Sequence, residues 1–302
     1  LIYKRKNEIE KSLDSFSKAL KINSNYLPSL INIAKIYTEL KDYDKADEYF
    51  NKSLKIDPNN VNALSSFINL KLETCNWENL DKLKLNLLDL CENNNNKILQ
   101  PYYSLLLSDN INFQKAIAEK YVNKFFQIKD ETFIHNNNKR IRLGYFSSDF
   151  KNHAVITLIK DVFKNHDKNK FDLFGFNLSR IYQKNLIDNV TISNFKEFFD
   201  CGYKSDLEIQ NLIKEHKIDI SIDLNGHTKD NRFEIFKKRC SPIQINYLGY
   251  PGTSGSSKFD YIIADKILIP DHLQNHYSEK IIYLPDTYQP NCFENFKLKK
   301  NL

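Results

Sequence analysis

The sequence predicts an α-helical repeat solenoid followed by an α/β domain built on a parallel sheet. The first observation is a repeat, because residues 17–25 and 51–59 are near copies separated by 34 positions. The second is a change of pattern after residue 139, where short apolar runs begin to alternate with amphipathic helical segments. Repeats of that length are helix pairs that bury their apolar faces by stacking. The alternation is typical of parallel strands covered by helices on both faces.

Length and composition limit the classes of function. At 302 residues the chain is long enough for about two domains, and its 41% hydrophobic content, with 21 Phe and 17 Tyr, can supply a core. Lys and Arg exceed Asp and Glu by only six, 44 against 38, and they are scattered. No apolar run approaches the roughly 20 residues of a membrane helix. We therefore expect neither a nucleic-acid nor a membrane partner.

The cysteines predict reduced thiols. Their number is odd, they lie far apart and none forms a Cys-x-x-Cys pair: Cys75, Cys91, Cys201, Cys240 and Cys292. This spacing supports neither a zinc ribbon nor a redox dithiol and favours a cytoplasmic protein. Because the chain starts at Leu1 and contains no Met, its true beginning is expected to be missing, which leaves targeting undetermined.

Residues 1–66 are predicted to be tetratricopeptide repeats. In the complete unit, the expected small, aromatic and helix-ending positions are occupied by Ala34, Tyr37, Ala46, Phe50 and Pro58. The first unit is cut off by the start of the chain, and the unit that begins at Val61 drifts from the pattern after Leu64.

Two polar features of the repeats are candidates for function. Asn32 lies one turn before Ile36, where its amide could bind an extended segment of an acceptor protein, although an ordinary solvated residue is an equal alternative. Asp42 and Asp44 form an Asp-x-Asp, a pattern that can hold a metal-bound nucleotide. They fall in the turn between two repeat helices, which disfavours the metal interpretation.

Residues 67–138 are predicted to be a helical connector and a linker. Leucines at amphipathic spacing continue the helical pattern: Leu70, Leu72, Leu80, Leu83, Leu87, Leu88 and Leu90. A polar break at 93–96 precedes another helical segment over 101–121, and residues 130–139 read as a polar linker. Trp77, beside Cys75, is expected to pack inside the connector.

Residues 139–302 are predicted to form the α/β domain. Its expected strands are 141–146, 171–177, 218–224, 243–248, 261–264 and 281–284, and its expected helices are 154–163, 206–216 and 232–238. The sequence contains neither Gly-x-Gly-x-x-Gly nor Gly-x-x-x-x-Gly-Lys-Ser/Thr, so it has no dinucleotide fingerprint and no P-loop motif. Open parallel sheets bind ligands at the carboxyl ends of their strands, which makes an enzyme the leading interpretation.

Three loops that follow strands carry the candidate chemistry. After the first strand, Asp149 and His153 stand where a helix begins, and a helix N-terminus favours anions or a polarised hydroxyl. The alternative makes Asp149 an N-cap and His153 a first-turn residue. After the third strand, a glycine-permitted turn presents His227, and Asp223 is either an orienting group or a satisfied buried acid. The loop 248–255 allows close backbone approach to a ligand, or is only a turn.

These loops, in this order, resemble glycosyltransferase family 41, the protein O-GlcNAc transferases and their SPINDLY-like relatives. The matching motifs are residues 142–153, 223–228 with Arg232 following, 242–255, 259–265 and 277–285. The likeness covers nearly the whole chain, because that family joins tetratricopeptide repeats to its catalytic region. Asn-Gly-His-Thr and the ending at 288–291 are closer to the bacterial branch.

The resemblance implies a GT-B fold, in which two Rossmann-like domains enclose the active site and residues 139–302 form the N-terminal one. It implies inverting transfer of N-acetylglucosamine from UDP-N-acetylglucosamine (UDP-GlcNAc) to Ser or Thr hydroxyls of proteins. It also implies that neither a metal nor another cofactor is needed, and that the repeats bind the acceptor protein.

The motif match also assigns candidate roles. Asp149 would be a proton-accepting candidate, and His153 would contact the sugar or the acceptor. Inversion requires a group that takes the proton of the acceptor hydroxyl opposite the leaving UDP. The substrate-binding candidates, of which the first two fall at the sugar pocket, are Leu248, Gly249, Tyr250, Pro251, His227, Thr228 and Arg232.

Two departures from the family pattern keep alternatives open. A histidine that animal members carry in the helical connector is replaced around Tyr102 or Tyr103. The chain also ends at Leu302, before the second domain, which holds most nucleotide contacts in the family. The alternatives are a SPINDLY-like O-fucosyltransferase that uses GDP-fucose, and a non-catalytic repeat scaffold that binds proteins.

We predict that the 302-residue chain by itself lacks transferase activity, because most contacts to uridine and diphosphate would lie in the second domain. Incubation with labelled UDP-GlcNAc and an acceptor peptide measures this directly. Robust transfer of label would contradict the expectation.

Overall fold

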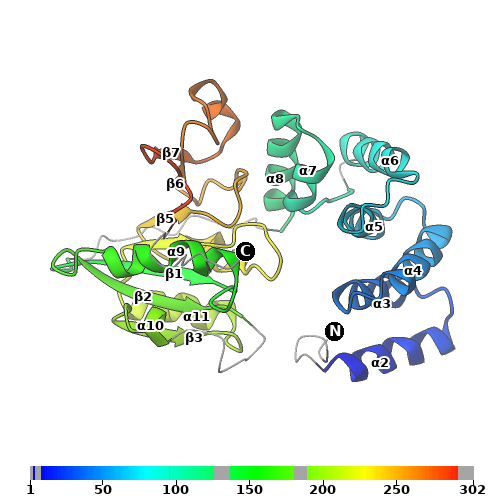
Figure 1. Cartoon of the computed structure of the whole chain (residues 1–302), viewed down its shortest axis with the longest axis horizontal. Coiled ribbons are helices and arrows are strands. Elements are labelled where there is room, and N and C mark those ends of the chain that lie inside the picture. The colour runs from blue at the N-terminus through cyan, green and yellow to red at the C-terminus, as the bar shows by residue number, and fades with distance from the viewer. Residues whose placement is uncertain (1–2, 4–7, 95, 126–136, 180–188, 292–302) are drawn as a thin grey trace, which may run out of the picture. The chain divides into compact units, whose positions relative to one another are not determined.

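The computed structural model describes residues 3, 8–94, 96–125, 137–179 and 189–291, and the chain divides into two compact units between Tyr121 and Val122. Cys292 and most of the expected linker 130–139 lie outside the described residues. The N-terminal part is helical (Figure 1): α2 Ile9–Ile22, α3 Leu27–Glu39, α4 Tyr43–Ile56, α5 Val61–Glu73, α6 Leu80–Asn93, α7 Pro101–Leu107 and α8 Ile111–Phe125. In the described part of the chain, no helix combines the length and the apolar character that crossing a membrane requires.

The predicted repeat helices are confirmed. Ala34 of α3 and Ala46 of α4 are fully buried, so the two helices approach closely, and Phe50 packs beneath them. The Phe50 ring lies 5.6 Å from that of Phe67 on α5, which continues the stack into the next helix. Asp42 ends the turn as the N-cap of α4 and accepts a hydrogen bond from the backbone N–H of Lys45.

The expectation that Trp77 packs inside the helical connector is wrong. The apolar faces of α5 to α8 do form one buried cluster, which includes Leu64, Leu87 and Phe113. Trp77, however, is 66% exposed. It lies in the turn between α5 and α6, close to two positive-φ residues, Cys75 and Asn79. The tight turn places the indole outside both helical faces.

The second unit contains a seven-stranded, fully parallel sheet in the order β3-β2-β1-β4-β5-β6-β7, which confirms the predicted parallel α/β architecture. Its strands are β1 Ile141–Ser147, β2 Phe171–Asn177, β3 Glu197–Asp200, β4 Ile220–Asp223, β5 Ile243–Asn246, β6 Tyr261–Ala264 and β7 Lys280–Tyr283. Its helices are α9 Ala154–Asn165, α10 Asn189–Ile192, α11 Asp206–Glu215 and the 3-10 helices η1 Phe233–Lys238 and η2 Asp271–His276.

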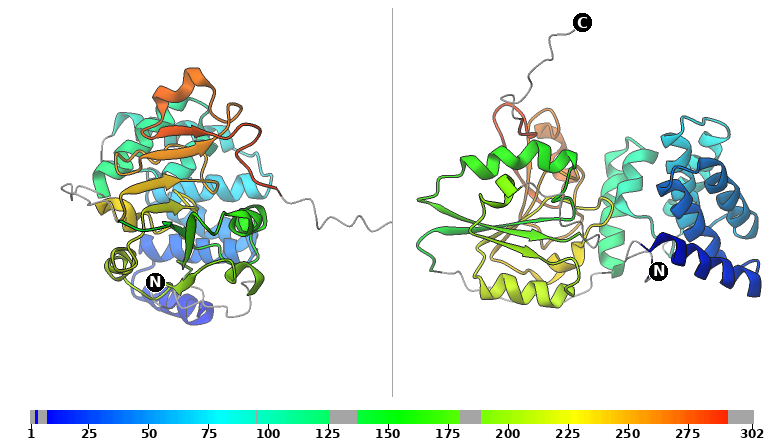
Figure 2. Two further views of the ribbon diagram at one scale, coloured as in Figure 1. Left: turned by 90° about the vertical axis from the view of Figure 1, so that its left-hand side faces the viewer. Right: turned by 60° about the horizontal axis from the view of Figure 1, so that its bottom comes forward.

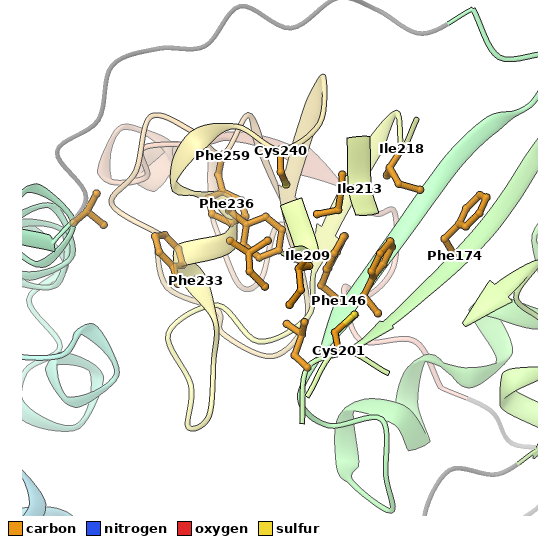
Figure 3. Close-up of a cluster of buried hydrophobic side chains, with 14 residues drawn as sticks. Phe146, Phe174, Cys201, Ile209, Ile213, Ile218, Phe233, Phe236, Cys240 and Phe259 are labelled. Atoms are coloured by element: carbon orange, nitrogen blue, oxygen red, sulfur yellow. The ribbon is translucent and has the colours of Figure 1, made fainter. Parts of the chain in front are cut away.

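Helices cover both faces of this sheet, α9 on one and α11 on the other (Figure 2). The strands alternate accordingly: Tyr145 of β1 joins the cluster beneath α9, while Phe146 joins the cluster with α11 and η1. Figure 3 shows this second cluster, in which Phe146 faces Phe236 of η1 and lies near Ile209 and Ile213 of α11. The Phe146 ring stacks on Phe176 at 4.3 Å between centroids. Buried aromatic pairs thus fix β1 beside β2.

Three elements differ from the sequence expectations. The strand β3 and the short helix α10 were not predicted, because β3 has only four residues and bears an acid at each end. It lies at the edge of the sheet, where one neighbour is missing and burial is partial. The helix expected over 232–238 is the 3-10 helix η1, which buries Phe233, Ile235 and Phe236 in a tighter turn.

The described cysteines are all free thiols, in agreement with the prediction of reduced cysteines. Burial raises the pKa of Cys91 to about 11 and the pKa values of Cys201 and Cys240 to about 12. These three thiols are therefore protonated and unreactive at neutral pH.

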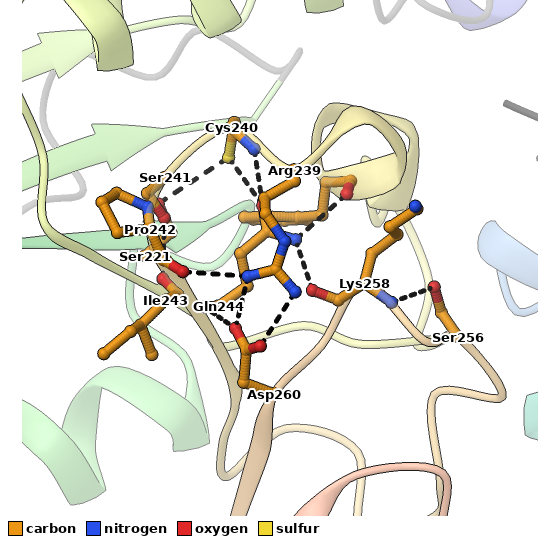
Figure 4. Close-up of polar contacts among 11 residues, drawn as sticks. Ser221, Arg239, Cys240, Ser241, Pro242, Ile243, Gln244, Ser256, Lys258 and Asp260 are labelled. Atoms are coloured by element: carbon orange, nitrogen blue, oxygen red, sulfur yellow. Dashed lines mark hydrogen bonds and ion pairs between the residues drawn. The ribbon is translucent and has the colours of Figure 1, made fainter. Parts of the chain in front are cut away.

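A buried polar network ties η1 and the loop before β6 to the start of β5 (Figure 4). The amide of Gln244 donates to the carbonyls of Phe236 (3.1 Å) and Lys258 (2.8 Å) and accepts from the backbone N–H of Cys240 (2.8 Å). The guanidinium of Arg239 forms a bidentate salt bridge with Asp260, in which each carboxylate oxygen accepts a hydrogen bond of 2.8 Å. Because Gln244 is fully buried, its amide satisfies backbone groups that water cannot reach.

We predict that Gln244→Leu destabilises the protein by about 3 kcal/mol, since it leaves several buried backbone groups without a partner. Gln274→Leu is the matched control, because Gln274 is exposed and its side chain, among the described residues, bonds only to Asp271 and Tyr283. Equilibrium denaturation followed by circular dichroism measures both. Equal, small effects of the two substitutions would contradict the structural role of Gln244.

Candidate active site at the carboxyl ends of β1, β4 and β5

The strands β1, β4 and β5 are neighbours at the centre of the sheet, and their carboxyl ends lie side by side. Phe146 of β1 is in register with Asp223 of β4, which in turn is in register with Asn246 of β5. The chain leaves β1 towards β2 on one side and leaves β4 towards β5 on the other, so the sheet order reverses between β1 and β4. This is the position at which open α/β sheets bind ligands.

The loop after β1 holds Asp149 in a fixed orientation. Asp149 is 8% exposed, and its Oδ2 accepts a hydrogen bond of 2.8 Å from Nδ2 of Asn225, in the loop after β4. The other end of that amide, Oδ1, accepts from the backbone N–H of Ser148 at 2.7 Å. Asn225 therefore clamps the loop after β1 at two consecutive residues and leaves Oδ1 of Asp149 facing Lys151 and His153.

His153, not Asp149, is the N-cap of α9, which corrects the alternative expectation for this pair. Its Nδ1 accepts a hydrogen bond of 3.3 Å from the backbone N–H of Val155. In a neutral imidazole that accepts at Nδ1, the proton lies on Nε2. Nε2 lies 3.9 Å from Oδ1 of Asp149, and the ammonium of Lys151 lies 3.4 Å from the same oxygen. This arrangement makes His153 a donor and leaves the carboxylate as the acceptor.

Asp223 shapes the loop after β4. Its two carboxylate oxygens accept the backbone N–H groups of Asn225 (3.0 Å) and Gly226 (3.1 Å). Burial raises its pKa to about 7, and these two hydrogen bonds only partly oppose that rise. Thr228 closes the turn by donating from Oγ1 to the carbonyl of Asn225 at 2.9 Å. These hydrogen bonds inside the loop restrict its backbone and fix the position of Asn225 beside Asp149.

The loops after β4 and β5 pack backbone against backbone, which requires glycine twice. A Cβ on Gly249 would collide with the carbonyl oxygen of Leu224, and one on Gly226 would lie 2.6 Å from Cβ of Tyr250. Gly226 also has a φ of +54°. Leu248 has a φ of +71°, and the N–H of Gly249 reaches back to the carbonyl of Tyr247 at 2.9 Å. Such a three-residue turn is strained for a leucine.

His227 is buried inside this pair of loops. It is 4% exposed, and its Nε2 donates to the carbonyl of Ser254 at 2.8 Å, while its ring stacks on Phe233 at 4.5 Å. Tyr250 packs edge-on against the same ring. Burial lowers the pKa of His227 to about 4, although the bond to Ser254 partly opposes this. His227 is therefore neutral near pH 7 and joins the two loops.

Glu279 anchors the far end of the loop after β5. It is buried, accepts from Thr253 Oγ1 at 2.7 Å and from the N–H of Ser254 at 2.6 Å, and its pKa is raised by burial. Tyr277 donates to the carbonyl of Pro251 at 3.3 Å. These contacts explain why polar residues just before β7 accompany the glycine-rich loop in the sequence.

Arg232 is bound outside the Asp149 cluster. Its guanidinium donates to the carbonyls of Cys201 (2.9 Å) and Lys204 (2.8 Å) and pairs with Asp206. All of these partners follow β3 or begin α11, and none lies in the loops after β1, β4 or β5. Arg232 thus stabilises the loop after β3. Its expected contact with substrate has no support in this geometry.

The other sequence candidates have simple local roles. Asn32 donates from Nδ2 to the carbonyl of Pro28 in its own helix at 2.7 Å, which leaves its amide oxygen for other contacts. Asp42 caps α4 as described. Among the described residues, no group of three or more His, Cys, Asp or Glu side chains could hold a metal ion.

Asn225 is the important site residue that was not singled out from the sequence. It stood inside the motif that presents His227, but only the structure shows that its amide reaches the loop after β1. Its position in the sequence indicated a site residue, because it lies just after the end of β4, as Ser148 and Asp149 lie just after the end of β1. Two more buried oxygens near these loops, Ser148 Oγ and Asn246 Oδ1, have no hydrogen-bond partner among the described residues. The hydroxyl of Ser148 can donate to or accept from a ligand, and the amide oxygen of Asn246 can accept.

Comparisons with known proteins bear on both units. A model of glycosyl transferase family 41 matches residues 74–295, and a tetratricopeptide-repeat model matches residues 27–60. The probable UDP-N-acetylglucosamine–peptide N-acetylglucosaminyltransferase SEC of Arabidopsis thaliana is 37% identical over 156 residues, which cover 52% of this chain and 16% of that protein. The UDP-N-acetylglucosamine–peptide N-acetylglucosaminyltransferase of Caenorhabditis elegans is 33% identical over 207 residues, 63% and 18% of the two chains.

A solved structure is also similar. A mutant of the O-GlcNAc transferase of Thermobaculum terrenum superposes with a TM-score of 0.75 at 19% identity, over 95% of this chain and 56% of that one. This likeness supports the fold, which is consistent with the helical region and one half of a GT-B protein. The chain spans less than a fifth of the length of the two curated relatives and just over half of the solved structure.

We predict that His227 makes stability depend on pH. Because the folded state lowers its pKa from 6.5 to about 4, its contribution is complete above pH 6.5 and is lost as the pH falls towards 4. The free energy of unfolding of the wild type, relative to that of His227→Gln, should therefore rise by up to about 3 kcal/mol as the pH increases from 4 to 6.5. Denaturant titrations at several pH values measure the difference.

The comparison with a variant is needed because Asp223 acts in the opposite direction. Its raised pKa of about 7 means that its contribution is complete below about pH 4 and is lost as the pH rises to 7. Subtracting the variant cancels this contribution. A difference that does not change with pH would contradict the buried, neutral state of His227.

Proposed function

Because this chain belongs to glycosyl transferase family 41, we propose that the protein transfers N-acetylglucosamine from UDP-GlcNAc to Ser or Thr hydroxyls of proteins. The relatives support the donor, since the names of the SEC, SPINDLY and nematode proteins all specify UDP-N-acetylglucosamine and a peptide acceptor. The tetratricopeptide repeats support a protein acceptor, because such solenoids present extended binding surfaces.

The observation that carries the proposal is the clamped carboxylate of Asp149 beside a histidine that caps a helix. Inverting transfer to a hydroxyl needs an acceptor for its proton as the new glycosidic bond forms and the bond to UDP breaks. Oδ1 of Asp149 is the open oxygen, because Oδ2 is held by Asn225. We assign Asp149 as the proton acceptor.

His153 has a complementary role in this proposal. Its Nδ1 is occupied by the N–H of Val155, so its Nε2–H is available to donate to an oxygen of the sugar, the acceptor or Asp149. A donor at this point can orient the acceptor hydroxyl or stabilise charge on an oxygen. The N-terminus of α9 adds partial positive charge on the same side.

The remaining contacts shape the pocket rather than the chemistry. Leu248 and Gly249 form the strained turn next to this cluster, and we propose that they border the sugar. His227 and Tyr250 are buried and hold that turn in place. No role in binding substrate is proposed for Arg232, because its hydrogen bonds go to the loop after β3.

A change of donor remains the second candidate. This chain is also similar to SPINDLY proteins, of which the one from Arabidopsis thaliana is 29% identical over 155 residues. Direct competition of labelled UDP-GlcNAc and labelled GDP-fucose, with one acceptor protein and the protein encoded by the full reading frame, separates them. Transfer from neither donor would favour the non-catalytic scaffold.

We predict that Asp149→Asn lowers kcat by about 10²–10⁴-fold with little change in the KM for the donor, because it removes the proton acceptor without changing shape. Asp161→Asn, on the same helix as the cap but away from the cluster, is the matched control and should leave kcat unchanged. Initial rates of label transfer, measured with the protein encoded by the full reading frame, give kcat for both variants. An Asp149→Asn variant with full kcat would refute the assignment.

A further inference from the structure

The helical unit contains a groove of about 900 Å³ between α4 and α6. Residues of α4, α5 and α6 line it, together with the turn that precedes α6: Asp47, Asn51, Phe67, Lys71, Asn79 and Lys82 are among them. No residue of α3, which carries Asn32, is among its lining residues in the described structure. The groove is therefore a surface that the candidate contact at Asn32 does not account for.

Lys71, in the floor of the groove, has a largely buried side chain whose ammonium meets no anionic partner among the described residues. It is 6% exposed, and its ammonium lies 5.1 Å from the centroid of the Phe67 ring, one turn earlier on α5. The ammonium makes no hydrogen bond or ion pair with any residue that the structure describes. The ring offers this ammonium, at an accessible site, only a weak attraction. A ligand with a negative group would supply the missing acceptor.

The start of α6 favours the same charge. This helix of 14 residues begins after Asn79, whose side chain makes no capping hydrogen bond and whose φ is +55°. The first N–H groups of α6 are therefore not capped by a side chain, and the helix dipole places partial positive charge there. Asn79 and Lys82 both line the groove. Two independent features on different helices thus face the groove with positive charge.

The rest of the lining limits the kind of anion. The groove also contains three acids, Asp44, Asp47 and Glu78, as many as its three lysines, Lys55, Lys71 and Lys82. A strongly charged polyanion would be repelled by the acids, whereas a single carboxylate placed at Lys71 would not meet a net negative field. Asn and Thr side chains in the lining, such as Asn51 and Thr74, can bond the peptide groups of an extended chain.

We propose that this groove binds an extended segment of a protein partner through one acidic side chain, whose carboxylate accepts hydrogen bonds from Lys71 beside the start of α6. A hydrogen bond between an ammonium and a carboxylate is charge-assisted, which makes it stronger than a hydrogen bond between neutral groups. This proposal does not depend on the proposed transferase function, because binding can be measured without donor or turnover.

The test uses the whole 302-residue chain and three pools of end-capped nonapeptides. The pools carry Glu, Gln or Lys at the central position and neutral residues elsewhere. Trp77, the single tryptophan of the chain, lies between two residues of the lining, Asn76 and Glu78, and is exposed. Its fluorescence therefore reports binding in the groove, and anisotropy of dye-labelled peptides gives the affinities.

We expect the Glu pool to bind about 10- to 100-fold more tightly than the Gln pool. Lys71→Met, which keeps the apolar stem, should abolish this preference, and Lys71→Arg should retain most of it. Lys84→Met, on α6 but outside the groove lining, should leave it unchanged. Circular dichroism and thermal melting verify that each variant folds. If Lys71→Met does not fold, the comparison of Lys71→Arg with the wild type is the decisive one.

Three results would overturn the proposal. The first is equal affinity for the Glu and Gln pools, and the second is a Glu preference that survives in Lys71→Met. The third is tighter, Lys71-dependent binding of a short single-stranded oligonucleotide than of the Glu pool, which would assign the groove to a polyanion. None of these outcomes requires or affects the transfer assay, so the two proposals fail separately.

Discussion

The candidate site depends on one buried amide. Asn225 spans two loops that belong to different strands, and both ends of its side chain are used, one on the backbone of Ser148 and one on the carboxylate of Asp149. An asparagine that is fully buried must satisfy its donors and acceptor internally, so each loop fixes the position of the other. Asp223 completes the constraint, because its carboxylate accepts a hydrogen bond from the backbone N–H of Asn225.

Around this amide, rigidity comes from close backbone packing rather than from a large apolar core. Gly226 and Gly249 let the loops after β4 and β5 approach to distances that a Cβ would prevent, and His227 joins them through a neutral, buried ring. The apolar clusters on the two faces of the sheet hold the strands in register. Together they place Asp149 and His153 at the reversal of the sheet order with little freedom to move.

The capping role of His153 has a chemical consequence. A histidine in an active site is often considered first as a base, but here its Nδ1 lone pair is used by the first turn of α9. In the proposed mechanism the two roles follow from this bond, with the carboxylate of Asp149 accepting a proton and the imidazole of His153 donating a hydrogen bond. In the helical unit, the proposal for Lys71 rests on similar reasoning, because its ammonium lines the groove and has no anionic partner among the described residues.

The sequence alone determined the repeat, the parallel sheet and the three loops that carry Asp149, His153 and His227, because periodicity and strand-to-loop junctions are local patterns. It could not place β3, whose four edge residues carry no clear alternation, nor predict that Trp77 would be exposed by a tight turn. Only the tertiary structure decided which polar residues meet. Asn225 and Asp149 are 76 positions apart, and Arg232, which stands in the same motif region as His227, turns to the loop after β3. Long-range hydrogen bonds of this kind depend on strand order and register, which the spacing of residues along the chain does not encode.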